Sequence, residues 1–110
     1  MQQEVIKMSN HVIDALDTAL RSWNAMAGSG QENAEAAADS FEASFYRFID
    51  TVREWVYGLE QPPQSMEELF DLPLIQTVLD RLPAPLYLNF ETEAELMIDG
   101  IVRIDEDKYD

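Results

Sequence analysis

The sequence predicts an α+β fold, with an N-terminal antiparallel helical hairpin, one or two short helices and a small C-terminal antiparallel β-meander. Two observations support this prediction. Apolar residues recur every three or four positions through the first half of the chain, which is the period of a helix face. After Pro85, apolar and polar residues alternate, which is the period of a half-buried strand. With 110 residues, 46% of them hydrophobic, residues 1–110 are expected to form a single domain.

The N-terminal hairpin is predicted from two long apolar stripes. The first helix is expected over residues 3–27, with a stripe formed by Val5, Val12, Leu16, Ala19 and Trp23. Gly28 and Gly30 then favour a turn, because glycine adopts left-handed backbone without a Cβ penalty. The second helix is expected over residues 31–59, with a near-heptad stripe of Ala34, Ala37, Phe41, Phe45, Phe48, Val52, Trp55 and Leu59. Two long helices joined by a short loop are expected to lie antiparallel.

Short helices are predicted over residues 65–82. Ser65-Met66-Glu67-Glu68 has the capping-box pattern, in which a serine hydroxyl and a glutamate carboxylate satisfy free backbone N–H groups at a helix start. Pro73 suits the first turn of a further helix, which Pro83 and Pro85 are expected to end.

The C-terminal β-meander is predicted over residues 86–104. Its first strand spans 86–91, where Leu86, Leu88 and Phe90 alternate with polar residues. The apolar segments 96–98 and 101–104 flank Asp99-Gly100, a pair that favours a type I′ hairpin turn.

A competing interpretation places residues 93–98 in a helical turn. Thr92 and Glu95 would then form a capping box, and Gly100 would end the turn. The hairpin is the preferred interpretation. Residues 105–110 are expected to form an acidic, frayed tail.

Charge excludes several classes of function. The chain has 22 acidic and 7 basic residues, for a formal net charge of -15. Such a chain is repelled by nucleic-acid backbones and by anionic membranes, so neither is expected as a direct partner. Charged residues interrupt the first apolar segment at Glu4, Lys7, Asp14, Asp17 and Arg21, so neither a signal peptide nor a membrane anchor is expected. A cytoplasmic location is therefore predicted.

No motif in the sequence indicates catalysis, a metal or a cofactor. There is no Cys, which excludes thiolate chemistry, and His11 is the only histidine. His11 precedes Asp14 by three residues, a spacing that also occurs on any solvated helix, and it is interpreted as a surface residue. The acidic segment 105–107 lacks the glycine and the later glutamate of a calcium-binding EF-hand loop. The protein is therefore expected not to be an enzyme and to bind no metal or cofactor.

The distribution of charge suggests a function in protein binding. Residues 1–55 have a net charge of -5, whereas residues 56–110 contain 13 acidic and 3 basic residues, for a net charge of -10. An acidic face of this kind suits a basic partner protein. We expect an inhibitor or antagonist that occupies a basic, often nucleic-acid-binding surface, such as a nucleic-acid mimic or an anti-defence protein of a phage or mobile element. The predicted partner-binding residues are Glu67, Glu68, Asp71, Glu91, Glu93, Glu95 and Asp99.

Two alternatives remain open at this point. The first is a helical-hairpin adaptor or oligomerisation subunit, in which the acidity serves solubility and a homodimer forms through Phe41, Phe45 and Trp55. The second is an immunity protein that binds a basic nuclease toxin.

Overall fold

The computed structural model describes the backbone of residues 2–28 and 30–108, and the side chains of residues 9–28, 30 and 32–102. All of the secondary structure in these residues is helical: α1 (Gln2–Ala27), η1 (Gln31–Asn33), α2 (Ala34–Tyr57), α3 (Met66–Phe70), α4 (Pro73–Arg81) and α5 (Ala84–Lys108). The contacts divide the chain into two compact units, residues 1–55 and 56–110. The expectation of a single domain stays a prediction.

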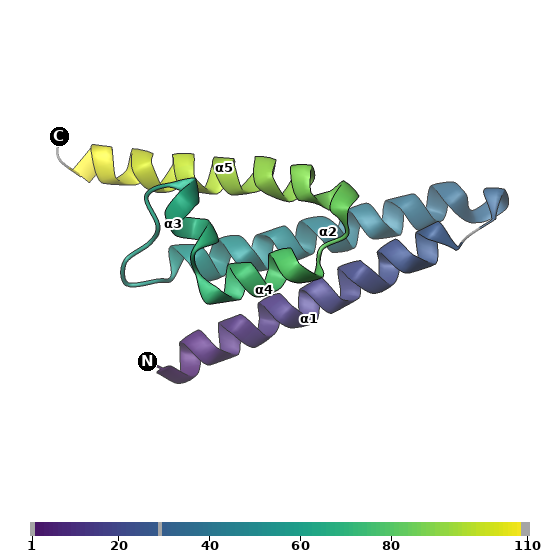
Figure 1. Ribbon diagram of the computed structural model, residues 1–110, viewed down its shortest axis with the longest axis horizontal. Coiled ribbons are helices and arrows are strands. Elements are labelled where there is room, and N and C mark those ends of the chain that lie inside the picture. Colours follow the sequence, from purple (N-terminus) through teal and green to yellow (C-terminus); the bar gives the residue numbers. More distant parts are fainter. Residues whose placement is uncertain (1, 29, 109–110) are drawn as a thin grey trace. The chain divides into compact units, whose positions relative to one another are not determined.

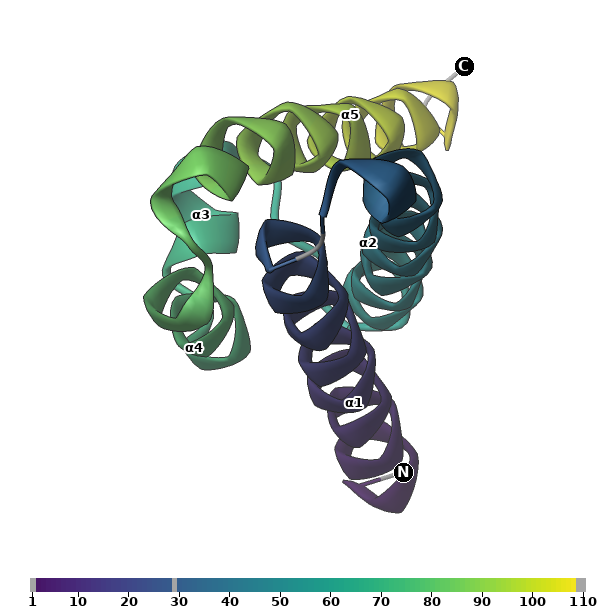
Figure 2. The ribbon, with the colours of Figure 1, turned by 90° about the vertical axis from the view of Figure 1, so that its right-hand side faces the viewer.

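The first unit is the helical hairpin that the periodicity predicts. Figures 1 and 2 show α1 and α2 side by side and antiparallel, joined by a short turn after Ala27. The buried residues of α1 and of the first unit's part of α2 follow helical spacing: Val12, Leu16 and Ala19 on α1, and Phe45, Phe48, Ile49, Val52 and Trp55 on α2. The rings of Trp23 and Phe41, with centroids 5.2 Å apart, connect the two helices near the turn. The side chain of Val5 lies outside the described residues.

The predicted capping box begins α3. The Ser65 hydroxyl accepts a hydrogen bond from the Glu68 N–H at 3.1 Å, as the pattern predicts. The Glu68 carboxylate accepts a hydrogen bond from the N–H of Gln64, at 2.6 Å. In the usual capping box this carboxylate would accept from the N–H of the N-cap residue, Ser65, but here it accepts from the residue before it. Pro73 is the first residue of α4, also as predicted.

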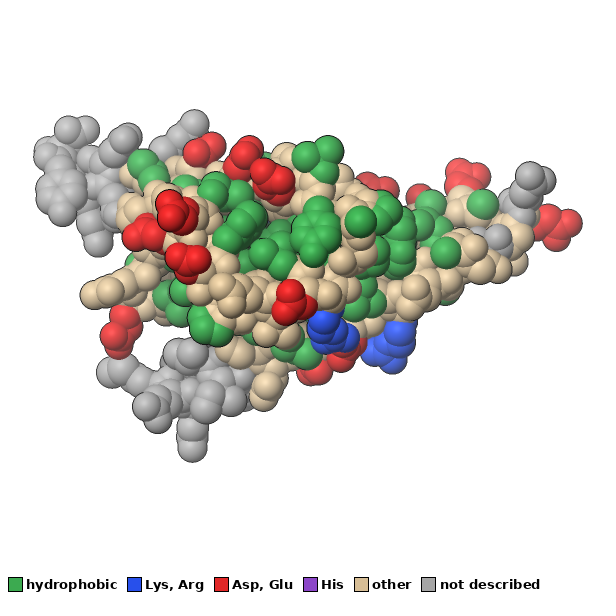
Figure 3. Space-filling view, in the orientation of Figure 1, with side chains coloured by type: hydrophobic (Ala, Val, Ile, Leu, Met, Phe, Trp, Pro, Cys, Tyr) green, Lys and Arg blue, Asp and Glu red, His purple; other side chains and the backbone are tan. Residues whose placement is uncertain are grey.

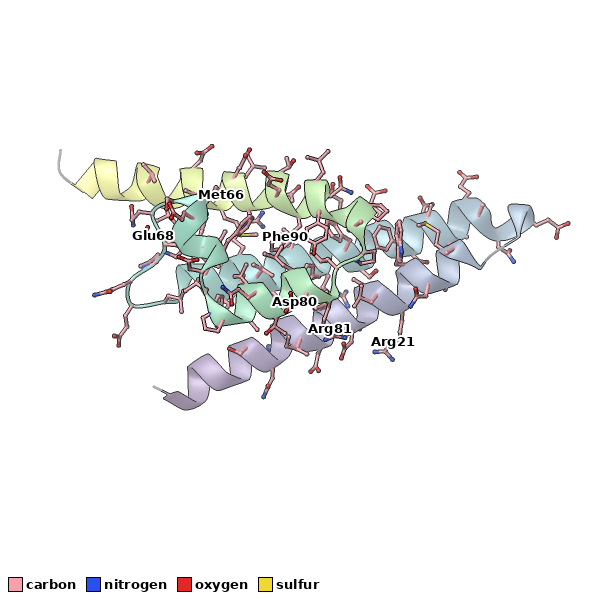
Figure 4. All side chains as sticks on the ribbon, viewed as in Figure 1. Arg21, Met66, Glu68, Asp80, Arg81 and Phe90 are labelled. Atoms are coloured by element: carbon pink, nitrogen blue, oxygen red, sulfur yellow. The ribbon has the colours of Figure 1, made fainter. Side chains whose placement is uncertain are left out.

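The predicted β-meander is wrong, because residues 84–108 form one long helix. The buried residues of α5 are Leu86, Phe90, Ala94, Met97, Ile98 and Ile101, whose steps of three and four mark one helix face. A strand over 86–91 would place Leu88 beside Leu86 and Phe90, yet Leu88 is 69% exposed. α3 packs against α4 and α5, and Phe90 points from α5 toward α4 (Figure 4).

The predicted hairpin turn is also wrong. Gly100 lies within α5 and has no positive φ, so Asp99-Gly100 does not form a type I′ turn. The competing interpretation is right that residues 93–98 are helical. It is wrong about where the helix begins and ends, because α5 begins at Ala84 and continues past Gly100. Thr92 lies within the helix and its hydroxyl donates a hydrogen bond to the Leu88 carbonyl at 3.0 Å, so it does not cap a new helix. α5 continues through the predicted tail to Lys108, and residues 109–110 lie outside the described residues.

Gly100 serves a close approach between α5 and the end of α2. The Tyr57 hydroxyl donates a hydrogen bond to the Met97 carbonyl at 3.3 Å. A Cβ added at Gly100 would lie 2.5 Å from the hydroxyl oxygen of Tyr57, but 3.6 Å from the ring carbon that carries it. The missing Cβ therefore makes room for the Tyr57 hydroxyl, whereas the ring itself would tolerate a Cβ at this position.

This geometry predicts that the effect of Gly100→Ala depends on residue 57. In the Tyr57→Phe background the substitution should raise the free energy of unfolding by about 1 kcal/mol, because alanine is the better helix former and the hydroxyl is gone. In the wild-type background the gain should be smaller or reversed. Urea unfolding of the wild type, the two single variants and the double variant, monitored by circular dichroism, gives the coupling free energy between residues 57 and 100. Equal gains in both backgrounds would contradict the role assigned to Gly100.

The capping box predicts a local effect of Ser65→Ala. Loss of the hydroxyl should weaken the start of α3 by about 1 kcal/mol, because the Glu68 N–H loses its acceptor. Amide hydrogen exchange should therefore accelerate at Glu68. Ser40→Ala, at an exposed position within α2, is the matched control, and it should leave exchange at Glu68 unchanged.

Candidate partner-binding site

The exposed face of α5 carries a row of carboxylates. Glu91, Glu95 and Asp99 are spaced by four residues and are all exposed, and we call them the acidic row. Residues spaced by four lie on one side of a helix, with about 6 Å of axial rise between neighbours. The three carboxyl groups therefore face solvent from one side of a rigid element.

Glu93 does not belong to this row. A strand through this segment would have placed Glu91, Glu93 and Glu95 on one side of a sheet, but the segment is helical. In a helix, two residues turn the chain by about 200°, so Glu93 points away from both neighbours in the set. It is half-buried, whereas Glu91 and Glu95 are exposed.

The basic residue nearest to the acidic row in the sequence is Arg103, four residues after Asp99, and its side chain lies outside the described residues. Residues 82–102 contain no Lys, Arg or His. Among the described residues, no ion pair or hydrogen bond engages Glu91, Glu95 or Asp99, whereas Asp50 in the first unit pairs with Arg53 at 2.9 Å. Like charges spaced by four residues destabilise a helix by about 0.2–0.5 kcal/mol per pair. The row is therefore a small cost to folding, and a cationic partner would relieve it.

Three of the predicted partner-binding residues lie on α3 or at its C-terminal end, and one of them also caps the helix. Glu67, Glu68 and Asp71 are all exposed, and Figure 3 shows acidic side chains gathered over α3 and along the outer edge of α5. Glu68, labelled in Figure 4, caps its own helix through the Gln64 N–H. Since α3 packs against α5, the structure keeps the two predicted sets of carboxylates within one unit.

Two exposed leucines lie beside the acidic row, and the sequence analysis missed them as surface residues. Leu88 is 69% exposed and Leu96 is 57% exposed, with Thr92 midway between them. We call Leu88, Thr92 and Leu96 the leucine ridge. The spacing of Leu86, Phe90 and Ala94 could have revealed it, because a helix that buries these three turns Leu88 outward.

A groove of about 950 Å³ lies in the second unit. Its walls include Tyr57, Pro62, Pro63, Leu72 and Ile101, with the carboxylates of Glu60 and Glu68 beside them. The loop that forms one wall is held by its own hydrogen bonds, including that from Gln64 to Glu68. No sequence motif pointed to this groove.

His11 and Asp14 line a separate hollow of about 280 Å³ in the first unit, together with Ser44, Arg47 and other residues of α1 and α2. This places a histidine, an acid and a hydroxyl in one place, which the sequence did not indicate. The Ser44 hydroxyl, however, donates to the Phe41 carbonyl at 2.9 Å. Within the described residues no hydrogen bond joins His11 to Ser44 or Asp14, so the arrangement lacks the linked base and nucleophile of acyl transfer.

The aromatic residues that were predicted to form an oligomer interface lie largely inside the single chain. Phe45 is 5% exposed and Trp55 is 7% exposed, while Phe41 is half-buried between Trp23 and Phe45. The indole N–H of Trp55 is buried and has no hydrogen-bond partner in the described structure.

Comparison with protein families, with curated proteins and with solved structures finds no match to this chain. In the part of the chain that the structure describes, no three or more His, Cys, Asp or Glu side chains are grouped to hold a metal ion. None of the described helices combines the length and the apolar character that a membrane span requires. The geometry of α5 is therefore the main basis for a functional hypothesis.

If the acidic row is a binding feature and not a stabilising one, neutralising its centre should stabilise the chain. Glu95→Gln removes two like-charge pairs and should raise the free energy of unfolding by about 0.4–1 kcal/mol at low salt. Asp50→Asn is the contrasting control, because it removes a carboxylate that pairs with Arg53, and it should not stabilise. Urea unfolding at two salt concentrations checks both. Destabilisation by Glu95→Gln would show that the row has an internal structural role.

Proposed function

We propose that this protein is a small acidic binding module that acts in the cytoplasm and occupies a basic surface of a target protein. The surface proposed for this contact is the acidic row on α5, supported by Glu67 on α3 and by Asp71, the C-cap residue of α3. A target surface that normally holds nucleic acid fits best, because carboxylates in a regular row can meet the Lys and Arg side chains that otherwise meet phosphates. The consequence for the target would be inhibition.

One observation carries this proposal: three exposed carboxylates, which pair with no basic group among the described side chains, are aligned on one side of α5, in a unit whose sequence has a net charge of -10. A surface that served solubility alone would not need charges aligned at a spacing that costs folding energy. Alignment on a helix also holds the charges in place, so a partner does not have to order them on binding.

The oligomerisation alternative receives less support. It required Phe41, Phe45 and Trp55 to be available to a second chain, whereas Phe45 and Trp55 are buried and Phe41 is half-buried. No described feature separates an immunity protein from other antagonists, because both would present carboxylates to a basic target.

Affinity capture from a lysate of the organism that makes the protein tests the proposal, at about 50 mM and about 500 mM salt, since surface charge is screened over this range. Proteins captured only at low salt are identified by mass spectrometry, purified and titrated. The triple variant Glu91→Lys, Glu95→Lys, Asp99→Lys should bind them about tenfold or more weakly, through loss of charge complementarity. A short DNA or RNA duplex should compete with the wild-type chain for the same target.

The matched control changes the net charge equally at another place. Glu32, Glu35 and Asp39 are exposed acidic residues of η1 and α2, and replacing all three by Lys should preserve most of the affinity. Equal losses in the two triple variants would mean that net charge alone drives binding. Capture that neither variant affects would refute the proposed site.

A further inference from the structure

We infer that the exposed face of α5 binds a cationic amphipathic helix of the target protein, with Leu88 and Leu96 as apolar anchors beside the acidic row. This inference rests on the proposed function, because it concerns the same face. It goes further by stating the form of the partner element and by adding an apolar contact that a purely electrostatic mimic would not need.

Two leucine side chains of α5 are exposed to solvent. Leu88 and Leu96 are among the large hydrophobic side chains that the structure leaves exposed, at 69% and 57%. Single exposed leucines are normal on a protein surface. Here the two share one side of one helix, two turns apart, with the small side chain of Thr92 between them. Burying both against a partner would remove two large apolar side chains from water.

The exposed face of α5 is organised in two parallel rows of side chains. Residues 88, 92 and 96 form one row at a spacing of four, and residues 91, 95 and 99 form the next row alongside it. Rows of this spacing are the ridges that interdigitate when two α-helices pack. The groove between the leucine ridge and the acidic row therefore has the shape that accepts a ridge of a second helix.

The charge of this face favours a cationic partner. The acidic row lies on one side of the leucine ridge, and no basic residue occurs before Arg103 in residues 82–103. A partner helix that places apolar residues against Leu88 and Leu96 would need Lys or Arg on the adjoining row. A second copy of this chain would instead bring like charges together, so it is a poor occupant.

Binding of two synthetic peptides to the full chain tests the inference. Each peptide contains only Ala, Leu and Lys and spans about five helical turns. The patterned peptide places Leu along one ridge and Lys along the next, whereas the scrambled peptide has the same composition with Leu on all sides. Fluorescence anisotropy at about 150 mM salt measures both dissociation constants, under conditions in which exposed charges are partly screened.

The wild-type chain should bind the patterned peptide about tenfold more tightly than the scrambled one, which is the size of effect expected from two apolar anchors. The double variant Leu88→Gln, Leu96→Gln should lose this preference and keep its affinity for the scrambled peptide. Glutamine is a good helix former, so α5 should be retained, and Leu88→Ala, Leu96→Ala provides a second version. Tyr46→Gln, at an exposed aromatic residue of the first unit, is the control that should change nothing.

Each outcome separates this inference from the proposed function. Equal affinity of the wild-type chain for both peptides, or a preference that survives both leucine variants, would overturn the inference. The triple Lys variant of the acidic row should bind both peptides more weakly than the wild-type chain does. If its affinities were unchanged, the charge-based function would be refuted. A preference for the patterned peptide that depends on the leucines would still support the apolar contact. Light scattering provides the remaining test, because a dimer abolished by the leucine variants would identify a second copy as the occupant.

Discussion

The burial of one apolar stripe on α5 is the constraint from which the organisation of the second unit follows. Leu86, Phe90, Ala94, Met97, Ile98 and Ile101 are all buried, and only a helix can place them on one side. Burying a large apolar side chain stabilises a fold by about 1.5–3 kcal/mol, which exceeds the repulsion between exposed carboxylates. Once this stripe is buried, the rotation of α5 about its axis is determined, and the acidic row and the leucine ridge must face outward.

The outward face of α5 therefore combines two properties that stability alone does not require. Its carboxylates lie close enough to repel each other and have no described partner, and two leucines beside them remain exposed. Interfaces that bind tightly commonly place apolar anchors at the centre and charged groups at the rim. α5 has this arrangement along one side, which is why a protein partner explains the face better than a need for solubility.

The first unit contributes a contrasting kind of surface. Its aromatic residues are largely used within the hairpin, where Trp23, Phe41, Phe45 and Phe48 form a chain of ring contacts. The hydroxyls around His11 are likewise occupied, since Thr18, Ser44 and Thr51 each donate to a carbonyl of their own helix. These hydroxyls and the Trp23, Phe41, Phe45 and Phe48 rings are thus engaged within the first unit, whereas the acidic row of the second unit has no partner among the described residues.

The sequence by itself determined the two long helices, the cap at Ser65 and the uneven charge, because each depends on residues close together in the chain or on composition. Tertiary structure decided whether residues 84–104 form strands or a helix. Leu86 and Phe90 share a face in both a strand and a helix, so a short alternating run cannot distinguish the two, and only burial of Ala94, Met97 and Ile101 settles the period. Gly100 looked like a turn residue, but its role is to admit Tyr57, which is 43 positions earlier in the chain. No local pattern encodes such a contact, because its partner is brought near only when the helices pack.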